Sequence, residues 1–151
     1  MTHKSIINLN NIKKSINSIK SNAPEIVAVS KTFKIRDIQP LIDYGHIHFG
    51  ENKVQEAISK WSEVKKLNKN IKLHMIGRLQ TNKVKTAVQL FDYIHSVDSI
   101  KLVEKISQEQ KKINKIIKIF IQINIGNEDQ KSGVRKENLK DLILACSDNN
   151  L

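Results

Sequence analysis

The sequence has 151 residues, of which 39% are hydrophobic and 27% are charged, and this composition is typical of a single globular domain with its own core. The longest apolar-rich run, residues 116–125, is too short and too interrupted to span a bilayer, and the N-terminus lacks the apolar core of a signal peptide. We therefore expect a cytoplasmic protein with no membrane partner, and the single cysteine, Cys146, agrees with a reducing compartment.

The net charge of +11 suggests an anionic partner, such as nucleic acid, an acidic surface or a phosphorylated small molecule. The lysines are spread along the chain, without an RNA-binding aromatic motif or a zinc-finger spacing. A nucleic-acid partner is therefore not expected, although the charge keeps it as an alternative.

Helical and extended patterns alternate along the chain. Apolar residues at helical spacing predict a first helix, Pro24 ends that pattern, and the apolar stretch IVAVS follows as a short strand. The alternation then recurs to the end of the sequence, and Ser99 is expected to cap the fifth helix. The predicted strands are 26–30, 46–50, 71–77, 93–97 and 116–125, and the predicted helices are centred on 6–19, 35–42, 54–64, 84–88, 100–106 and 137–148.

Apolar strands that alternate with amphipathic helices predict an α/β fold with a parallel sheet covered by helices. Two architectures fit this order: an open doubly wound sheet, or part of a (β/α)8 TIM-type barrel. In both architectures the functional residues lie at the carboxyl ends of the strands. Polar and glycine residues do gather there: Ser30, Lys31, Gly50, Glu51, Asn52, His74, Gly77, Arg78, Ser96, Asp98 and Asn124.

Lys31 directly follows the first buried strand. A lysine amine that is partly withdrawn from water favours its uncharged form, which is a nucleophile toward an aldehyde and can form a Schiff base. An ordinary solvated surface lysine is the competing interpretation, and from spacing alone the two are equally favoured.

Other candidates are weaker. His46 and His48 could bind a metal with Glu51, but no third ligand stands at a diagnostic spacing, so no metal is predicted. His74 could contact a ligand or be a hydrogen-bonded core histidine. Cys146 lies in the apolar pattern LILAC and is expected to be a buried, inert thiol.

Five motifs stand in a fixed order along the chain: VAVSKT, HFGENKVQE, HMIGRLQTNK, HSVD and IQINIGNEDQKSG. In order and approximate spacing they resemble the pyridoxal-phosphate homeostasis protein family, whose fold is similar to the barrel domain of alanine racemase. The resemblance covers nearly the whole chain from residue 26. The blocks GEN..QE and IG.LQ.NK are specific when they occur together, and either one alone would be weak.

The resemblance implies a barrel that holds pyridoxal 5′-phosphate (PLP) as an internal aldimine on Lys31. It implies that Asn52 and His74 line the cofactor pocket, although Leu73 stands where the family usually has tryptophan. The family's members look like monomeric PLP carriers that affect vitamin B6 and amino-acid balance, so neither catalytic residues nor turnover are expected. The alternative is a racemase-like enzyme that uses the same lysine.

Members of the family are considerably longer than this sequence, which stops about where a sixth strand should begin. The resemblance therefore implies one PLP-binding barrel domain, 1–151, that is incomplete at its C-terminus and contains about five β/α units. The remainder would hold the backbone nest for the PLP phosphate and an arginine facing the pyridine nitrogen. A fragment, a truncated gene and a piece completed by a partner all fit.

Overall fold

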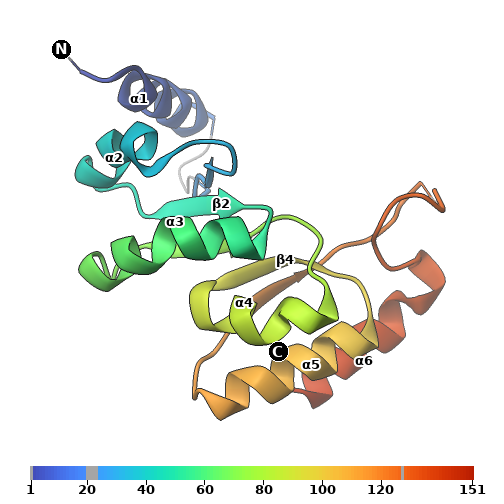
Figure 1. The fold of residues 1–151 in the computed structure, drawn as a ribbon. Coiled ribbons are helices and arrows are strands. Elements are labelled where there is room, and N and C mark those ends of the chain that lie inside the picture. Colours follow the sequence, from blue (N-terminus) through green and yellow to red (C-terminus); the bar gives the residue numbers. More distant parts are fainter. Residues whose placement is uncertain (1, 20–23, 127) are drawn as a thin grey trace.

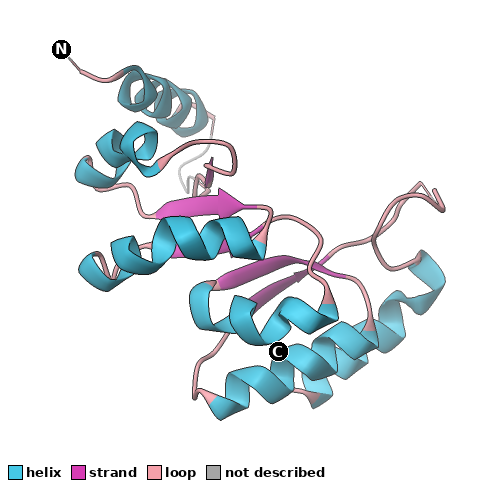
Figure 2. Cartoon of the chain, viewed as in Figure 1, coloured by secondary structure: helices cyan, strands magenta, loops and turns pink. Residues whose placement is uncertain are grey.

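A computed structural model describes residues 2–19, 24–126 and 128–151 of the chain, in which helices and strands alternate (Figures 1 and 2). Asn127, inside the last of the five motifs, lies outside the described residues. The elements are α1 (Lys4–Asn17), β1 (Ala28–Val29), α2 (Ile35–Asp43), β2 (His48–Glu51), α3 (Val54–Leu67), β3 (Lys72–Met75), the short 3-10 helix η1 (Thr81–Lys83), α4 (Val84–Leu90), β4 (Tyr93–Val97), α5 (Ile100–Lys112), β5 (Lys118–Ile121), the 3-10 helix η2 (Lys136–Asn138) and α6 (Leu139–Asp148).

The five strands form one parallel sheet in the order β1-β2-β3-β4-β5, which is also their order in the chain. A doubly wound sheet would reverse its strand order at a switch point and carry helices on both faces. Here α2 to α6 all contribute side chains to one core, and Figure 1 shows α3, α4 and α5 on the same side of the strands. The sheet is therefore an open arc of the barrel type, as one of the two predicted architectures requires.

The core lies between the sheet and its helices. Phe49, Leu73 and Ile94 point from three neighbouring strands into it and are fully buried. Trp61 on α3 packs against Phe49 with ring centroids 4.9 Å apart. Because side chains alternate along a strand, the residues directly before and after each of these three face the opposite side of the sheet.

We call that opposite side the open face. The register aligns five of its residues across the sheet: Val29, Gly50, His74, Tyr93 and Lys118. Apolar side chains on this face remain accessible, since Val29 is 50% exposed and Phe120 is 51% exposed. The strands thus bury one face under helices and leave the other open.

All the predicted helices and strands are present, but several boundaries differ. The first helix begins at Lys4 because the His3 side chain accepts a hydrogen bond from the Ser5 backbone N–H, a capping interaction that the apolar spacing does not reveal. The strand predicted over 116–125 is shorter in the structure, Lys118–Ile121, and beyond it Ile123 pairs with Val134 of the following loop. No described helix has both the length and the hydropathy that crossing a membrane requires.

Candidate functional site

Lys31 and Asn52 lie just beyond the carboxyl ends of two neighbouring strands, β1 and β2. Ser30, the residue before Lys31, is buried, and its backbone N–H donates to the Gly50 carbonyl oxygen at 2.9 Å. Lys31 itself is exposed. Among the residues that the structure describes, its amine takes part in no ion pair and no side-chain hydrogen bond, whereas Lys60 and Lys65 each bind a carboxylate.

Asn52 is held from the other side by the end of β3. A Cβ atom placed on Gly77 would lie 2.4 Å from the Asn52 carbonyl oxygen and 2.9 Å from its Cα. Real Cβ atoms do not approach backbone so closely, so only glycine fits at this position. The glycine of the IGRLQ motif therefore serves a close backbone approach, and it fixes where Asn52 lies.

Below this edge, three histidines form a continuous chain across the open face. His48 Nδ1 lies 2.9 Å from His74 Nε2, and His74 Nδ1 lies 2.9 Å from His95 Nε2. The His74 ring also stacks on Tyr93 with centroids 4.2 Å apart, and the His95 ring stacks on Phe120 at 4.4 Å. Burial is the main cause that lowers the pKa of His74 to about 4, and the charges of His95 and His48 lower it further.

His74 is thus buried and hydrogen-bonded through both ring nitrogens, which was one of its two predicted environments. Its contact with a cofactor stays a prediction. The weak metal alternative finds no converging ligands, because the His46 ring binds the His48 carbonyl oxygen and Glu51 is buried among residues of the core side. Over the described ranges, no three His, Cys, Asp or Glu side chains are placed to hold a metal ion.

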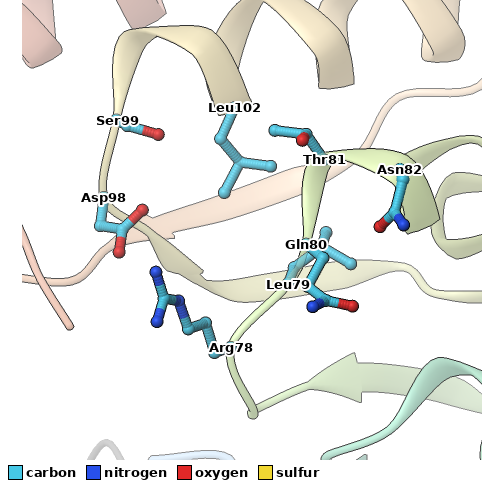
Figure 3. Close-up of a pocket in the computed structure, with 8 residues that line it drawn as sticks. All are labelled: Arg78, Leu79, Gln80, Thr81, Asn82, Asp98, Ser99 and Leu102. Atoms are coloured by element: carbon cyan, nitrogen blue, oxygen red, sulfur yellow. The ribbon is translucent and has the colours of Figure 1, made fainter. Parts of the chain in front are cut away.

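A polar pocket of about 740 Å³ lies further along the same edge, between the connections that follow β3 and β4 (Figure 3). Arg78 and Asp98, both named by the strand-end rule, line it and extend toward one another in Figure 3. Lys31, Asn52 and His74 are not among the lining residues. The pocket therefore adjoins the candidate site and does not contain it.

Sequence reasoning missed two features of the site. Lys60, on α3, donates hydrogen bonds to both Glu51 and the Ser30 carbonyl, and its helical spacing gives no sign of this. The part played by His95 could have been found, because a strand that begins at Tyr93 places His95 on the same face as Tyr93.

Known proteins are similar to this chain in sequence and in fold. Residues 7–151 match the family model described as "Alanine racemase, N-terminal domain". The protein named "Pyridoxal phosphate homeostasis protein" from Pasteurella multocida is 34% identical over 134 residues, which are 87% of this chain and 58% of that relative. Its namesake from Aquifex aeolicus is 38% identical over 121 residues, which are 80% of this chain and 52% of the relative. The chain thus spans about half the length of these curated relatives.

Solved structures are also similar to this chain in fold. PipY of Synechococcus elongatus PCC7942 with PLP bound has a TM-score of 0.78 and 32% identity, and the match covers 91% of this chain and 63% of that chain. An alanine racemase from Clostridium difficile 630 has a TM-score of 0.67 but only 17% identity, over 92% of this chain and 35% of that chain. The second likeness shows the fold alone.

Proposed function

The chain belongs to the alanine racemase N-terminal domain family, and from this premise we propose that it binds PLP and takes part in PLP homeostasis. The curated relatives bear the name of that function, and a solved relative at 32% identity contains PLP. The proposal extends to residues 1–151 as a single PLP-binding domain whose barrel is incomplete at its C-terminus.

The observation that carries the proposal is the state of Lys31. Its amine follows an anchored, buried serine at the carboxyl edge of the sheet, and within the described ranges it has no carboxylate or carbonyl partner. PLP supplies an aldehyde that reacts with a primary amine, and an accessible amine at the mouth of a barrel fits that group. Lys60 and Lys115 fit poorly, because their ammonium groups are held by carboxylate or carbonyl oxygens.

We assign Asn52 a direct contact with the cofactor, because it follows the strand β2 that pairs with β1, at whose end Lys31 lies, and because Gly77 lies close against its backbone. For His74 we propose an indirect part in the pocket. Both of its ring nitrogens already have histidine partners, so it would support the pocket wall by holding His95 in place.

The role we propose is binding without turnover, as in a carrier or buffer of PLP. The racemase neighbours share the fold at low identity and do not argue for turnover. Measurable racemization of an amino acid by the full-length protein would favour the enzyme instead. We place the protein in the cytoplasm as a monomer, and the single cysteine supports a reducing compartment.

The test is the PLP-dependent visible absorbance of the purified protein and of its Lys31→Ala variant. We expect the variant to lose this absorbance and to keep its circular dichroism spectrum, because an exposed lysine contributes little to packing. Lys34→Ala is the matched control, since Lys34 is also exposed and lies three residues away. Absorbance that is unchanged in Lys31→Ala, or lost equally in Lys34→Ala, would contradict the assignment.

Nucleic-acid binding remains the other reading of the +11 charge. Such binding would weaken as salt rises, because it releases counterions from the phosphate backbone. Salt-dependent retention of DNA or RNA would favour it, and no retention at low salt would remove it.

A further inference from the structure

We propose that Glu51 is a positioning residue that fixes the backbone directly before Lys31 and directly before Asn52. The inference rests on the proposed function, because it concerns how this chain holds the residue assigned to PLP. It goes beyond that function by assigning a part to a buried carboxylate, and to a lysine on α3, that do not themselves reach the cofactor.

One oxygen of Glu51 collects three donors from separate parts of the fold. The Ser30 hydroxyl donates to Oε1 at 2.7 Å, the Lys60 ammonium at 2.8 Å and the Trp61 indole N–H at 2.9 Å. The carboxylate is fully buried, so these bonds form out of contact with water. Glu51 therefore ties the end of β1 to helix α3 at the position just before Lys31.

The same network fixes the backbone of Ser30. Its N–H donates to the Gly50 carbonyl at 2.9 Å, and its own carbonyl accepts a hydrogen bond from Lys60 at 2.8 Å. That carbonyl belongs to the peptide group that joins Ser30 to Lys31. The orientation of this peptide is therefore held by Lys60 together with the Phe33 N–H, which donates to the same carbonyl at 3.0 Å, and Lys60 is in turn held by Glu51.

The network also reaches Asn52. The carbonyl of Glu51 accepts a hydrogen bond from the Ile76 N–H at 2.9 Å, so β3 holds the peptide group that leads into Asn52. The two residues assigned to the cofactor thus each follow a residue of the network directly. The side chain of Glu51 acts on the backbone before Lys31, and its carbonyl group acts on the backbone before Asn52.

Packing alone would not select a glutamate here. A buried charge carries a large desolvation penalty, and an apolar side chain of similar volume would avoid it. The second oxygen, Oε2, is one of only two buried side-chain polar atoms without a partner in the described part of the chain. A residue that breaks a local rule in this way, beside a candidate site, fits a functional requirement better than a packing one.

The test uses the full-length protein with substoichiometric PLP, borohydride trapping and peptide mapping of the label on each lysine. We expect the wild type to carry the label chiefly on Lys31. Glu51→Ala should lower the share on Lys31 roughly tenfold, because misplacement of a reacting group strongly reduces its effective concentration. Glu51→Gln should retain most of the preference, since its amide oxygen can still accept from Ser30 and Trp61.

Two further variants separate positioning from general loss of stability. Glu109→Ala removes another buried carboxylate, which pairs with Lys105 and Lys112 on α5, away from the edge of β1 and β2. It should lower the melting temperature and leave the Lys31 share unchanged. Ser30→Ala removes the hydroxyl contacts with Glu51 at 2.7 Å and with the Gly50 carbonyl oxygen at 3.2 Å but keeps the Glu51 side chain. It therefore keeps the test available if Glu51→Ala does not fold, and it should lower the share several-fold.

Each outcome decides one of the two proposals. Label scattered over many lysines in the wild type would overturn the proposed function, and this inference with it. Label on Lys31 in the wild type, with the same share in Ser30→Ala and in a folded Glu51→Ala, would leave the function standing and overturn the part assigned to Glu51. An equal loss of preference in Glu109→Ala would also overturn it.

Discussion

At the scale of single residues, the three histidines of the open face can share protons in only a few ways. Each of the two 2.9 Å contacts between ring nitrogens has room for one hydrogen. One additional proton is accommodated, because a doubly protonated His74 can donate to both neighbours. A second would set two N–H groups against each other. Burial lowers the pKa of both His74 and His95, so these two rings are neutral at pH 7.

This arrangement predicts that the protein loses stability as the pH falls below the ordinary histidine range. The pKa of His74 in the folded state is about 4, against an ordinary histidine pKa of 6.5, so between these values the unfolded chain binds more protons. Stability contributed by His74 is therefore complete above pH 6.5 and is lost as the pH drops toward 4, by roughly 3 kcal/mol.

Urea unfolding of the wild type and of His74→Phe between pH 7 and pH 4.5 would measure this effect. Phenylalanine keeps a ring against Tyr93 but does not titrate, so the variant should be less stable at pH 7 and should vary less with pH. Carboxylates that titrate near the lower end act equally in both proteins and cancel in the comparison. The same pH dependence in both proteins would contradict the assignment to His74.

The residues of the site could be predicted from the sequence only in part. Lys31 and Asn52 follow from one rule, that function gathers where parallel strands end, together with the motifs that resemble a known family. Alternation along β4 places His95 on the same face as Tyr93, but the contacts of His74 with His48 and His95 depend on the register of three strands, which the sequence does not give. The contacts of Lys60 with Ser30 and Glu51 could not be predicted for a similar reason, because a helical pattern does not show which strand end a side chain meets.

At the scale of elements, the close approach of β3 to the end of β2 predicts that Gly77→Ala is disruptive. The new methyl group would lie 2.4 Å from the Asn52 carbonyl oxygen, so the two strand ends must separate. We expect a loss of about 1–3 kcal/mol in the free energy of unfolding, as for other overpacked sites, and weaker PLP binding through displacement of Asn52.

Chemical denaturation and PLP titration of the variant would measure both effects. Gly126→Ala is the matched control, because its Cβ would meet only the flexible end of the Glu128 side chain, at 3.2 Å. If Gly77→Ala were as stable as Gly126→Ala and bound PLP normally, the close approach would have no part in holding Asn52.

The sequence predicts the elements themselves well, because each strand is a short apolar run and each helix a stripe with helical spacing. It predicts their ends less well. IVAVS reads as a five-residue strand, yet only Ala28 and Val29 pair in the sheet. Ser99 does stand at the N-cap of α5 as expected, but its side chain makes no capping bond. The length of the strand and the capping of the helix both depend on hydrogen-bond partners, and the spacing of apolar residues does not reveal those partners.

At the scale of the whole molecule, apolar surface gathers where β5 and α6 meet. Ile116 is 84% exposed, Phe120 51% and Ile143 50%, and all three line an apolar hollow of about 800 Å³ between β5 and α6. Within the described residues, β5 pairs along its length with β4 alone. An accessible strand edge with apolar side chains is a template for pairing with another chain.

We therefore predict that the 151-residue chain, prepared by itself, self-associates as its concentration rises. Ile116→Lys combined with Phe120→Lys should reduce this association, because charged side chains next to a strand edge oppose pairing. Light scattering over a concentration series would measure it, with Ile19→Lys as the control, since Ile19 is 87% exposed but follows α1, far along the chain from β5. Equal association in both variants would show that the β5 region is not responsible.

The agreement between strand order and chain order also bears on how the protein is made. Each strand pairs with the strand that precedes it, and the paired residues that begin the ladders, such as Ala28 and Phe49 or Tyr93 and Lys118, are separated in sequence by a single helix. Parallel pairing of this kind has to close a loop that contains a whole helix, so it forms more slowly than contacts within a helix or a hairpin. As the chain leaves the ribosome, every new strand meets a partner that has already been synthesised, so the sheet can grow in the direction of translation, one unit at a time.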